Sequence, residues 1–235
     1  MRLKISVQIY TQNTQTSPSS KRTGKLEKIM VKATPIEQVF DGSVQNILNV
    51  LDQATETQIM AGENWYFLAQ NLAQDLAEKH DLEWQNVAAA IAALSPCLDW
   101  VTNVIAIREV IEKGKSRAQS GANNHKAREA LKCDIGIINR TGKAKKVESF
   151  FNAIIDPISN ENMAVCDRHA VSVFMGQKLT DKQLGAMGRV GAYEIVSNAY
   201  HEASKISDRP VHEIQAITWV VWRDLHDVDR LIGKS

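Results

Sequence analysis

Two segments near the middle of the chain carry residue types that could act on an electrophilic carbon. The first, residues 142–146, is a glycine turn that carries three lysines, Lys143, Lys145 and Lys146, into an apolar helix. The second places one carboxylate, Asp167, between a short apolar run and the start of another helix. A lysine amine and a buried carboxylate that meet in one pocket can perform nucleophilic chemistry at carbon. One of the lysines and Asp167 therefore form a candidate catalytic pair.

The three lysines admit three interpretations. As a run of charge they could simply be solvated surface residues. Cations at a helix N-terminus oppose the helix dipole, so their presence is easier to explain if the turn at Gly142 faces a phosphate backbone. Alternatively, one lysine turned inward beside Val147 and Phe150 would have a lowered pKa and could act as an amine nucleophile. The spacing alone leaves all three interpretations open.

Asp167 also has two interpretations, and they are compatible. Aspartate is common as the N-cap of a helix, and the apolar residues that follow it predict a helix there. A capping carboxylate is also held in place, so it could stabilise positive charge at a reacting centre. Arg168 and His169, which follow it, could contact phosphate, although histidine in such a place is more often a structural hydrogen-bonding residue.

Composition excludes several classes of protein. The chain has 235 residues, 44% of them apolar, and a net charge of +1, so it can bury a core and is not a general polyanion binder. The charge is uneven, since the segment from Arg108 to Lys146 has eleven Lys/Arg and four acids, a local net charge of +7. Such a segment could attract nucleic acid or could be a solvated helical face.

Three widely spaced cysteines argue against a disulfide framework, a zinc site or an iron–sulfur cluster, and they suit a reducing compartment. The sequence has no apolar run of membrane-span length and no signal-peptide core near its start. We therefore expect a soluble, cytoplasmic protein with no cofactor, no metal and no membrane partner.

Beyond residue 34 the apolar residues recur at three- and four-residue steps, which predicts an all-α fold of eight to ten helices. Residues 1–34 are polar and basic and predict a disordered arm, with a brief strand at 3–10. The helical domain is then 35–235. A Gly/Asn/Ser-rich loop at 114–124 divides it into expected lobes at about 35–113 and 124–235.

Several helix boundaries have local signals. Pro96 ends a helix that begins near Trp84, and Thr180 to Gln183 forms a capping box that opens a helix expected to run to about Ile206. Apolar stripes are predicted on several helices, and one of them comprises Trp65, Leu68, Leu72 and Leu76. On the last helix, Trp219 and Trp222 suit core packing better than a base-stacking platform.

Three segments, taken in order, resemble the helix-hairpin-helix DNA glycosylase superfamily. Residues 93–103 resemble the segment that opens the helical barrel of that family, and residues 140–147 resemble its hairpin turn and lysine segment. Residues 164–173 resemble its aspartate segment. Lys146 then matches the catalytic lysine and Asp167, 21 positions later, the catalytic aspartate. The closing helices resemble a divergent branch found among bacteriophage proteins.

The resemblance implies an enzyme that flips a nucleotide out of duplex DNA carrying a damaged or modified base and acts at its glycosidic carbon. Gly142, Lys143, Lys145, Arg168 and His169 would contact the nucleic acid. If the chain is phage-encoded, it would act in the host cytoplasm. Members of the wider superfamily remodel modified thymines in phage DNA, which gives one alternative activity. A nucleic-acid-binding helical protein that has lost catalysis is another, and a helical interaction protein without nucleic acid is a third.

Overall fold

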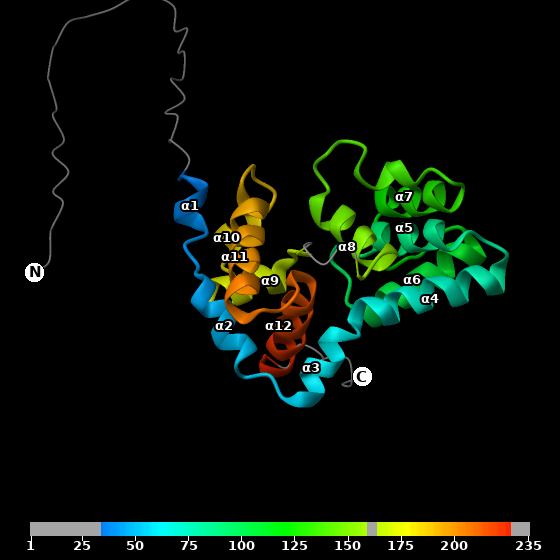
Figure 1. Ribbon diagram of the computed structural model, residues 1–235. Coiled ribbons are helices and arrows are strands. Elements are labelled where there is room, and N and C mark those ends of the chain that lie inside the picture. Colours follow the sequence, from blue (N-terminus) through cyan, green and yellow to red (C-terminus); the bar gives the residue numbers. More distant parts are fainter. Residues whose placement is uncertain (1–33, 159–163, 227–235) are drawn as a thin grey trace, which may run out of the picture. The chain divides into compact units, whose positions relative to one another are not determined.

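The computed structural model describes residues 34–158 and 164–226, and within these ranges the chain is helical with no strand (Figure 1). The all-α prediction is therefore confirmed. The described part has more helices than expected, because short breaks interrupt stretches whose apolar periodicity is continuous. Its elements are α1 (Ile36–Val39), α2 (Val44–Leu51), α3 (Glu56–Glu63), α4 (Trp65–His80), α5 (Trp84–Leu94), α6 (Trp100–Lys113), α7 (Gly121–Leu131), the 3-10 helix η1 (Ile135–Asn139), α8 (Lys145–Ile155), α9 (Arg168–Met175), α10 (Asp181–Ala186), α11 (Ala192–Ser207) and α12 (Val211–Leu225).

Buried apolar residues form two clusters. The first cluster contains the inner faces of α4 to α8 with η1, and the second contains those of α1, α2 and α9 to α12. Figure 1 shows the corresponding two groups of helices. The clusters divide the chain differently from the expected lobes, because α1 and α2 pack with the C-terminal helices rather than with α4 to α6.

Helix α5 is the centre of the first cluster. Its residues from Val87 to Leu94 are all almost completely buried, as expected for a helix that is apolar on every side. Helices α4, α6, α7 and α8 all pack against it. It ends at Ser95 and Pro96, as predicted, and the chain then turns into α6, which is capped by Asp99 at its start and Gly114 at its end.

The apolar stripe predicted for α4 is partly wrong. Leu68 is 59% exposed, whereas Tyr66, Ala69 and Ala73 form the buried face. Alanines let two helices approach closely, and the facing helix α5 is itself rich in alanine. Large apolar residues on α4 therefore did not identify the face that packs.

The capping box at Thr180 is present, but the long helix predicted after it is not. Helix α10 ends at Ala186, and the chain turns before α11 begins at Ala192. Gly191 makes this turn with a positive φ of 88°, a conformation in which glycine is favoured. Apolar periodicity continues across the turn, which explains why the sequence predicted one helix.

Helices α3 and α12 pack closely, and Gly62 makes this possible. A Cβ atom at this position would lie 2.5 Å from the Ile217 side chain. The contact fixes the start of α4 against α12, which matters because Trp65 and Trp219 lie on these two helices. The two tryptophan rings are 4.7 Å apart between centroids.

The predicted N-terminal arm and its strand at 3–10 lie outside the described residues. Among the described helices, none combines the length and apolar character needed to cross a membrane.

Candidate functional site

Lys146 lies in the first turn of α8 and points toward the end of α5. Its Nζ donates a hydrogen bond to Ser95 Oγ at 2.7 Å and lies 5.5 Å from the centre of the Phe150 ring. Burial lowers the pKa of this ammonium, and the nearby Asp167 carboxylate partly opposes that shift. A lowered pKa increases the fraction of neutral amine near neutral pH, which is the nucleophilic form.

Asp167 is the N-cap of α9, so the capping interpretation is confirmed. Its Oδ1 accepts hydrogen bonds from the backbone N–H groups of His169 at 2.8 Å and Ala170 at 2.9 Å. Within the described part of the chain, its Oδ2 has no hydrogen-bond partner. The cap thus fixes one oxygen and leaves the other available.

The segment before Asp167 explains where its side chain points. Ala164 and Cys166 belong to the second cluster, whereas Val165, between them, belongs to the first. The segment thus alternates between the two clusters, and Asp167 lies on the side of Val165, with which it lines one cavity. The Tyr193 hydroxyl holds this segment, since it donates to the Ala164 carbonyl at 2.6 Å and lies 2.7 Å from Ser149 Oγ on α8.

Lys146 and Asp167 line one cavity of about 70 Å³. No salt bridge joins them, although both lie in the described part of the chain, so the space between them is not closed by direct contact. The structure thus brings the two candidate residues to one cavity. The other lining residues are Trp65, Tyr66, Ser95, Leu98, Asp99, Trp100, Asn103, Phe150, Val165, Gln215, Ala216 and Trp219.

Aromatic rings form much of the cavity wall. Trp65 is central, because its ring lies 5.4 Å from that of Trp100 and 4.7 Å from that of Trp219. These rings come from α4, α6 and α12, which are far apart in the sequence. Trp222, by contrast, is buried in the second cluster. The prediction of core packing was therefore right for Trp222, whereas Trp219 faces the cavity.

The cavity opens into a groove of about 850 Å³ that shares its residues Ser95, Asp99, Lys146 and Asp167. Seven Lys/Arg and three acids line the groove, which gives its wall a net positive charge. The basic residues are Lys126, Lys143, Lys145, Lys146, Arg168, Arg189 and Arg223. A positive groove of this kind favours a polyanionic ligand.

The glycine turn forms one rim of this groove. Gly142 has a positive φ of 67°, and its backbone N–H bonds to the Asn139 carbonyl at 2.8 Å. Lys143 is exposed, and Lys145 is paired with Glu194. All three predicted contact residues of the turn line the groove.

Arg168 and His169 also line the groove, from the first turn of α9. Burial lowers the pKa of His169, which favours the neutral form of its ring, and the Asp167 carboxylate partly opposes that shift. The ring lies edge-on to Trp219, with centroids 6.4 Å apart. His169 is thus a packing residue as well as a groove residue.

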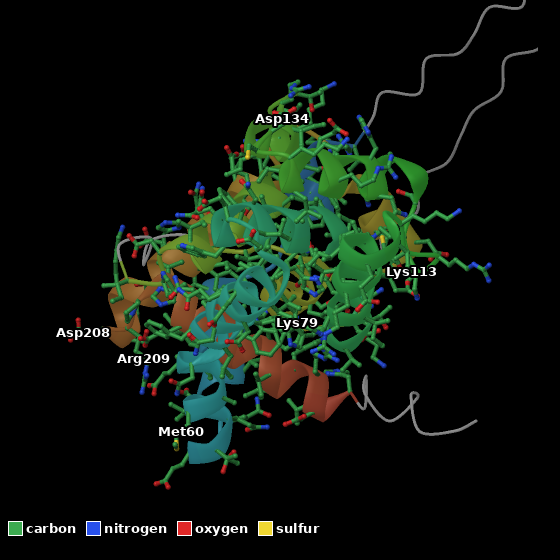
Figure 2. All side chains as sticks on the ribbon, turned by 90° about the vertical axis from the view of Figure 1, so that its right-hand side faces the viewer. Met60, Lys79, Lys113, Asp134, Asp208 and Arg209 are labelled. Atoms are coloured by element: carbon green, nitrogen blue, oxygen red, sulfur yellow. The ribbon has the colours of Figure 1, made fainter. Side chains whose placement is uncertain are left out.

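The basic segment 108–146 does not form one charged face. Figure 2 shows Lys113 and Asp134 projecting from separate places on the surface. Several of its cations have local partners, since Lys113 lies 3.9 Å from Glu109 and Arg140 pairs with Asp134. Of its basic residues, Lys126 and the three lysines at its end, Lys143, Lys145 and Lys146, line the groove.

Sequence reasoning gave no site role to three residues that build the cavity. Trp65, like Trp219, suited core packing better than base stacking, and Trp100 and Asn103 lie in the segment 93–103 without a role of their own. Asn103 lies one helical turn after Asp99, so it could have been found once Asp99 was assigned as a cap facing the pocket. The tryptophans become visible only when the helices are packed.

The fold and the cavity define an all-helical protein with an amine and a carboxylate at the end of a basic groove. The described residues include no cluster of three or more His, Cys, Asp or Glu side chains that could hold a metal ion. The chain belongs to a family described as a family of unknown function (DUF7178), which it matches over residues 28–226. No curated protein and no solved structure matches it.

Proposed function

We propose that the protein is a DNA-base-acting enzyme of the glycosylase/lyase type, built on a fold related to the helix-hairpin-helix glycosylases. One observation carries the proposal: Lys146 and Asp167, 21 residues apart, line the same aromatic cavity at the end of a basic groove. A flipped nucleotide would place its base in the cavity and its phosphates along the groove.

The chemistry follows from the two side chains. As the bond between C1′ and the base breaks, its electron pair leaves with the base, and the Asp167 carboxylate stabilises the positive charge that develops on the sugar. The neutral Lys146 amine uses its lone pair to form a bond to C1′. Loss of the amine protons and opening of the sugar ring then give an imine between Lys146 and C1′. Loss of a proton from C2′ then forms the C2′–C3′ double bond as the C3′–O bond breaks, so the 3′ phosphate leaves and the strand is cleaved. Water hydrolyses the imine and frees Lys146.

Binding of the polyanion is supported by the rim residues. Lys143 is exposed at the Gly142 turn, and Arg168 lies on the opposite element, at the start of α9. Phosphate oxygens accept hydrogen bonds from such side chains and from the backbone at a helix start. Because these contacts read no sequence, they would hold any duplex in register for flipping.

The test is incubation of the purified chain with duplexes that each carry one damaged or modified base, in the presence of borohydride. We expect base release and a trapped covalent adduct on at least one duplex, and loss of the adduct in Lys146→Met. The control is Lys113→Met, which changes an exposed lysine that lines neither the cavity nor the groove and should keep the adduct. Salt-dependent binding without release or adduct on every duplex would instead favour the non-catalytic alternative, and a modified thymine converted without excision would favour the base-modifying one.

A further inference from the structure

The buried amide of Asn103 is a second polar group of the cavity wall, beside the Asp167 carboxylate, whose hydrogen bonding is incomplete in the described part of the chain. The residue is 2% exposed, and its Oδ1 has no hydrogen-bond partner in the described part of the chain. Its Nδ2 donates to the Ile91 carbonyl at 3.2 Å. A carbonyl can only accept, so this bond fixes which end of the amide is the free acceptor.

An unpaired buried acceptor is costly, and native proteins seldom keep one without a reason. Here the acceptor belongs to a residue that lines the cavity, and Lys146, whose Nζ can donate a hydrogen bond, lines the same cavity. A ligand that fits must therefore present one N–H group beside carbonyl oxygens. The edges of pyrimidine bases have this combination of groups.

Size restricts the ligand further. The cavity holds about 70 Å³, whereas an engineered cavity of about 150 Å³ is known to take one benzene ring. The cavity is therefore too small for a whole ring and takes only the recognised edge of a base, with the rest of the base in the mouth toward the groove. A single-ring pyrimidine leaves less of itself outside the cavity than a fused purine does, and it is the better fit. Trp65 and Trp219 supply the apolar walls on which such a ring would pack.

We infer that the cavity recognises a pyrimidine through its N–H group, and that Asn103 is the residue that reads it. The inference rests on the proposed function, because it takes the cavity to be the base pocket. It adds the class of base and a specificity residue. Thymine and uracil offer the ring N3–H, whereas cytosine offers an exocyclic N–H. All three are pyrimidines with an N–H donor, so the test must distinguish the two kinds of donor.

The experiment measures fluorescence anisotropy of the full chain with duplexes that differ only at one mispaired nucleotide. The nucleotides are thymine, uracil, cytosine, adenine, N3-methylthymine and an abasic analogue, each opposite cytosine, with which none of them forms a Watson–Crick pair. N3-methylthymine lacks the N–H and also pairs more weakly, so a loss of affinity cannot come from a higher cost of flipping the base out of the duplex.

We expect thymine and uracil to bind about tenfold more tightly than N3-methylthymine, a typical effect of one lost hydrogen bond, and adenine to bind like the abasic analogue. A cytosine affinity equal to that of thymine would extend the N–H class to the exocyclic donor.

N3-methylthymine could bind weakly because it lacks the N–H or because its N3-methyl group does not fit. Asn103→Leu distinguishes these two explanations. It nearly keeps the shape of the side chain but removes the acceptor, so thymine affinity should fall to the N3-methylthymine value. Unchanged thymine affinity would overturn the inference. Asn86→Leu is the matched control, because Asn86 is also a buried asparagine, 5% exposed, that lines neither the cavity nor the groove.

Two further outcomes keep this inference separate from the proposed function. If the wild-type chain binds every duplex, including the abasic one, but treats thymine and N3-methylthymine alike, the inference fails while the DNA-binding proposal stands. This comparison needs no variant, so it holds even if Asn103→Leu does not fold. If the wild-type chain binds no duplex at low salt, the proposed function itself fails.

Discussion

Two aspartates cap helices at the edge of the same cavity, and their bonding differs. Asp99 caps α6, and Thr102 engages both of its oxygens, through its N–H at 2.9 Å and its hydroxyl at 2.6 Å. Asp167 caps α9 through Oδ1 alone. The same local signal therefore produces one carboxylate that is satisfied within its own helix and one that keeps an oxygen for another partner.

The electrostatic surroundings of Asp99 and Asp167 also differ. Partial burial raises the pKa of Asp99, but the Thr102 bonds and the Arg223 charge outweigh it and lower the pKa overall. Asp167, in contrast, acts on Lys146, whose pKa it raises against the larger effect of burial. Both aspartates thus cap a helix, but only Asp167 shifts the pKa of the Lys146 amine.

The sharpest test of this comparison exchanges each carboxylate for its amide. Asn caps a helix about as well as Asp, so Asp167→Asn should fold normally but lose charge stabilisation, with turnover lower by about 10²–10³-fold. Asp99→Asn should stay within about threefold of the wild-type chain, because its role is local capping. Single-turnover base release on the best duplex from the panel measures both. Equal losses in the two variants would remove the distinction between the caps.

A second test asks whether the Asp167 segment needs its external support. Tyr193→Phe removes the shorter of the two hydrogen bonds to the Ala164 carbonyl and leaves only that from the Cys166 N–H at 3.1 Å, and Ala164 is 2% exposed. We expect the free energy of unfolding to fall by about 1–2 kcal/mol. Turnover should fall about tenfold, because a small displacement of a catalytic group is costly. Urea unfolding and single-turnover rates give the two values.

Tyr200→Phe is the control for that variant. Its hydroxyl is also buried, on the same helix α11, but lies against the Ala170 carbonyl and Thr218 rather than the segment before Asp167. It should lower stability and leave the single-turnover rate unchanged. If both variants slow base release equally, Tyr193 has only a general structural role.

A third test concerns the amine that Asp167 acts upon. Burial lowers the pKa of Lys146 in the folded chain below its unfolded value, so the unfolded state binds more protons between the two pKa values. Stability of the wild-type chain should therefore rise with pH in that window, up to about the unfolded lysine pKa of 10.4. Below the window the buried ammonium is a constant cost, which Lys146→Met removes, and the variant should be more stable by roughly 1 kcal/mol.

The measurement is thermal unfolding of both chains between pH 6 and 10. The advantage of Lys146→Met should be largest at the lower pH and should shrink as pH rises. Lys145→Met, at an exposed lysine, should show no such trend. An advantage that grows with pH would contradict the lowered pKa.

These contrasts mark how far the sequence could lead. Signals that act over a few residues predicted the structure well: Pro96 ends α5, the loop predicted from residue 114 follows α6, and Thr180 opens α10 with a capping box. The cap at Asp167 is of the same kind. Apolar periodicity predicted the helical class but not the breaks within it, because a turn such as the one at Gly191 preserves the spacing.

The cavity required information that no local pattern contains. Trp65, Trp100 and Trp219 meet because three separate helices pack together, and the free acceptor of Asn103 depends on a bond to Ile91 on another helix. Asp167 and Tyr193 are related in the same way, across an extended segment. The resemblance singled out Lys146 and Asp167, but only the packed structure shows what surrounds them.

The smallest expected effect is on DNA binding, which Asp167→Asn and Asp99→Asn should leave nearly unchanged. Lys143 is exposed at the rim of the groove and lacks a salt-bridge partner in the described part of the chain. If it contacts one phosphate, Lys143→Ala should reduce the slope of log affinity against log salt by about 0.9 and weaken binding to all duplexes alike. Lys113→Ala is the control, since Lys113 lies away from the groove beside Glu109 and should leave the slope unchanged. Anisotropy titrations from 50 to 200 mM salt, roughly the range over which such contacts are resolved, measure both slopes. A slope that falls equally in both variants would mean that the groove does not direct the polyanion, and the difference between the two caps would then concern some other substrate.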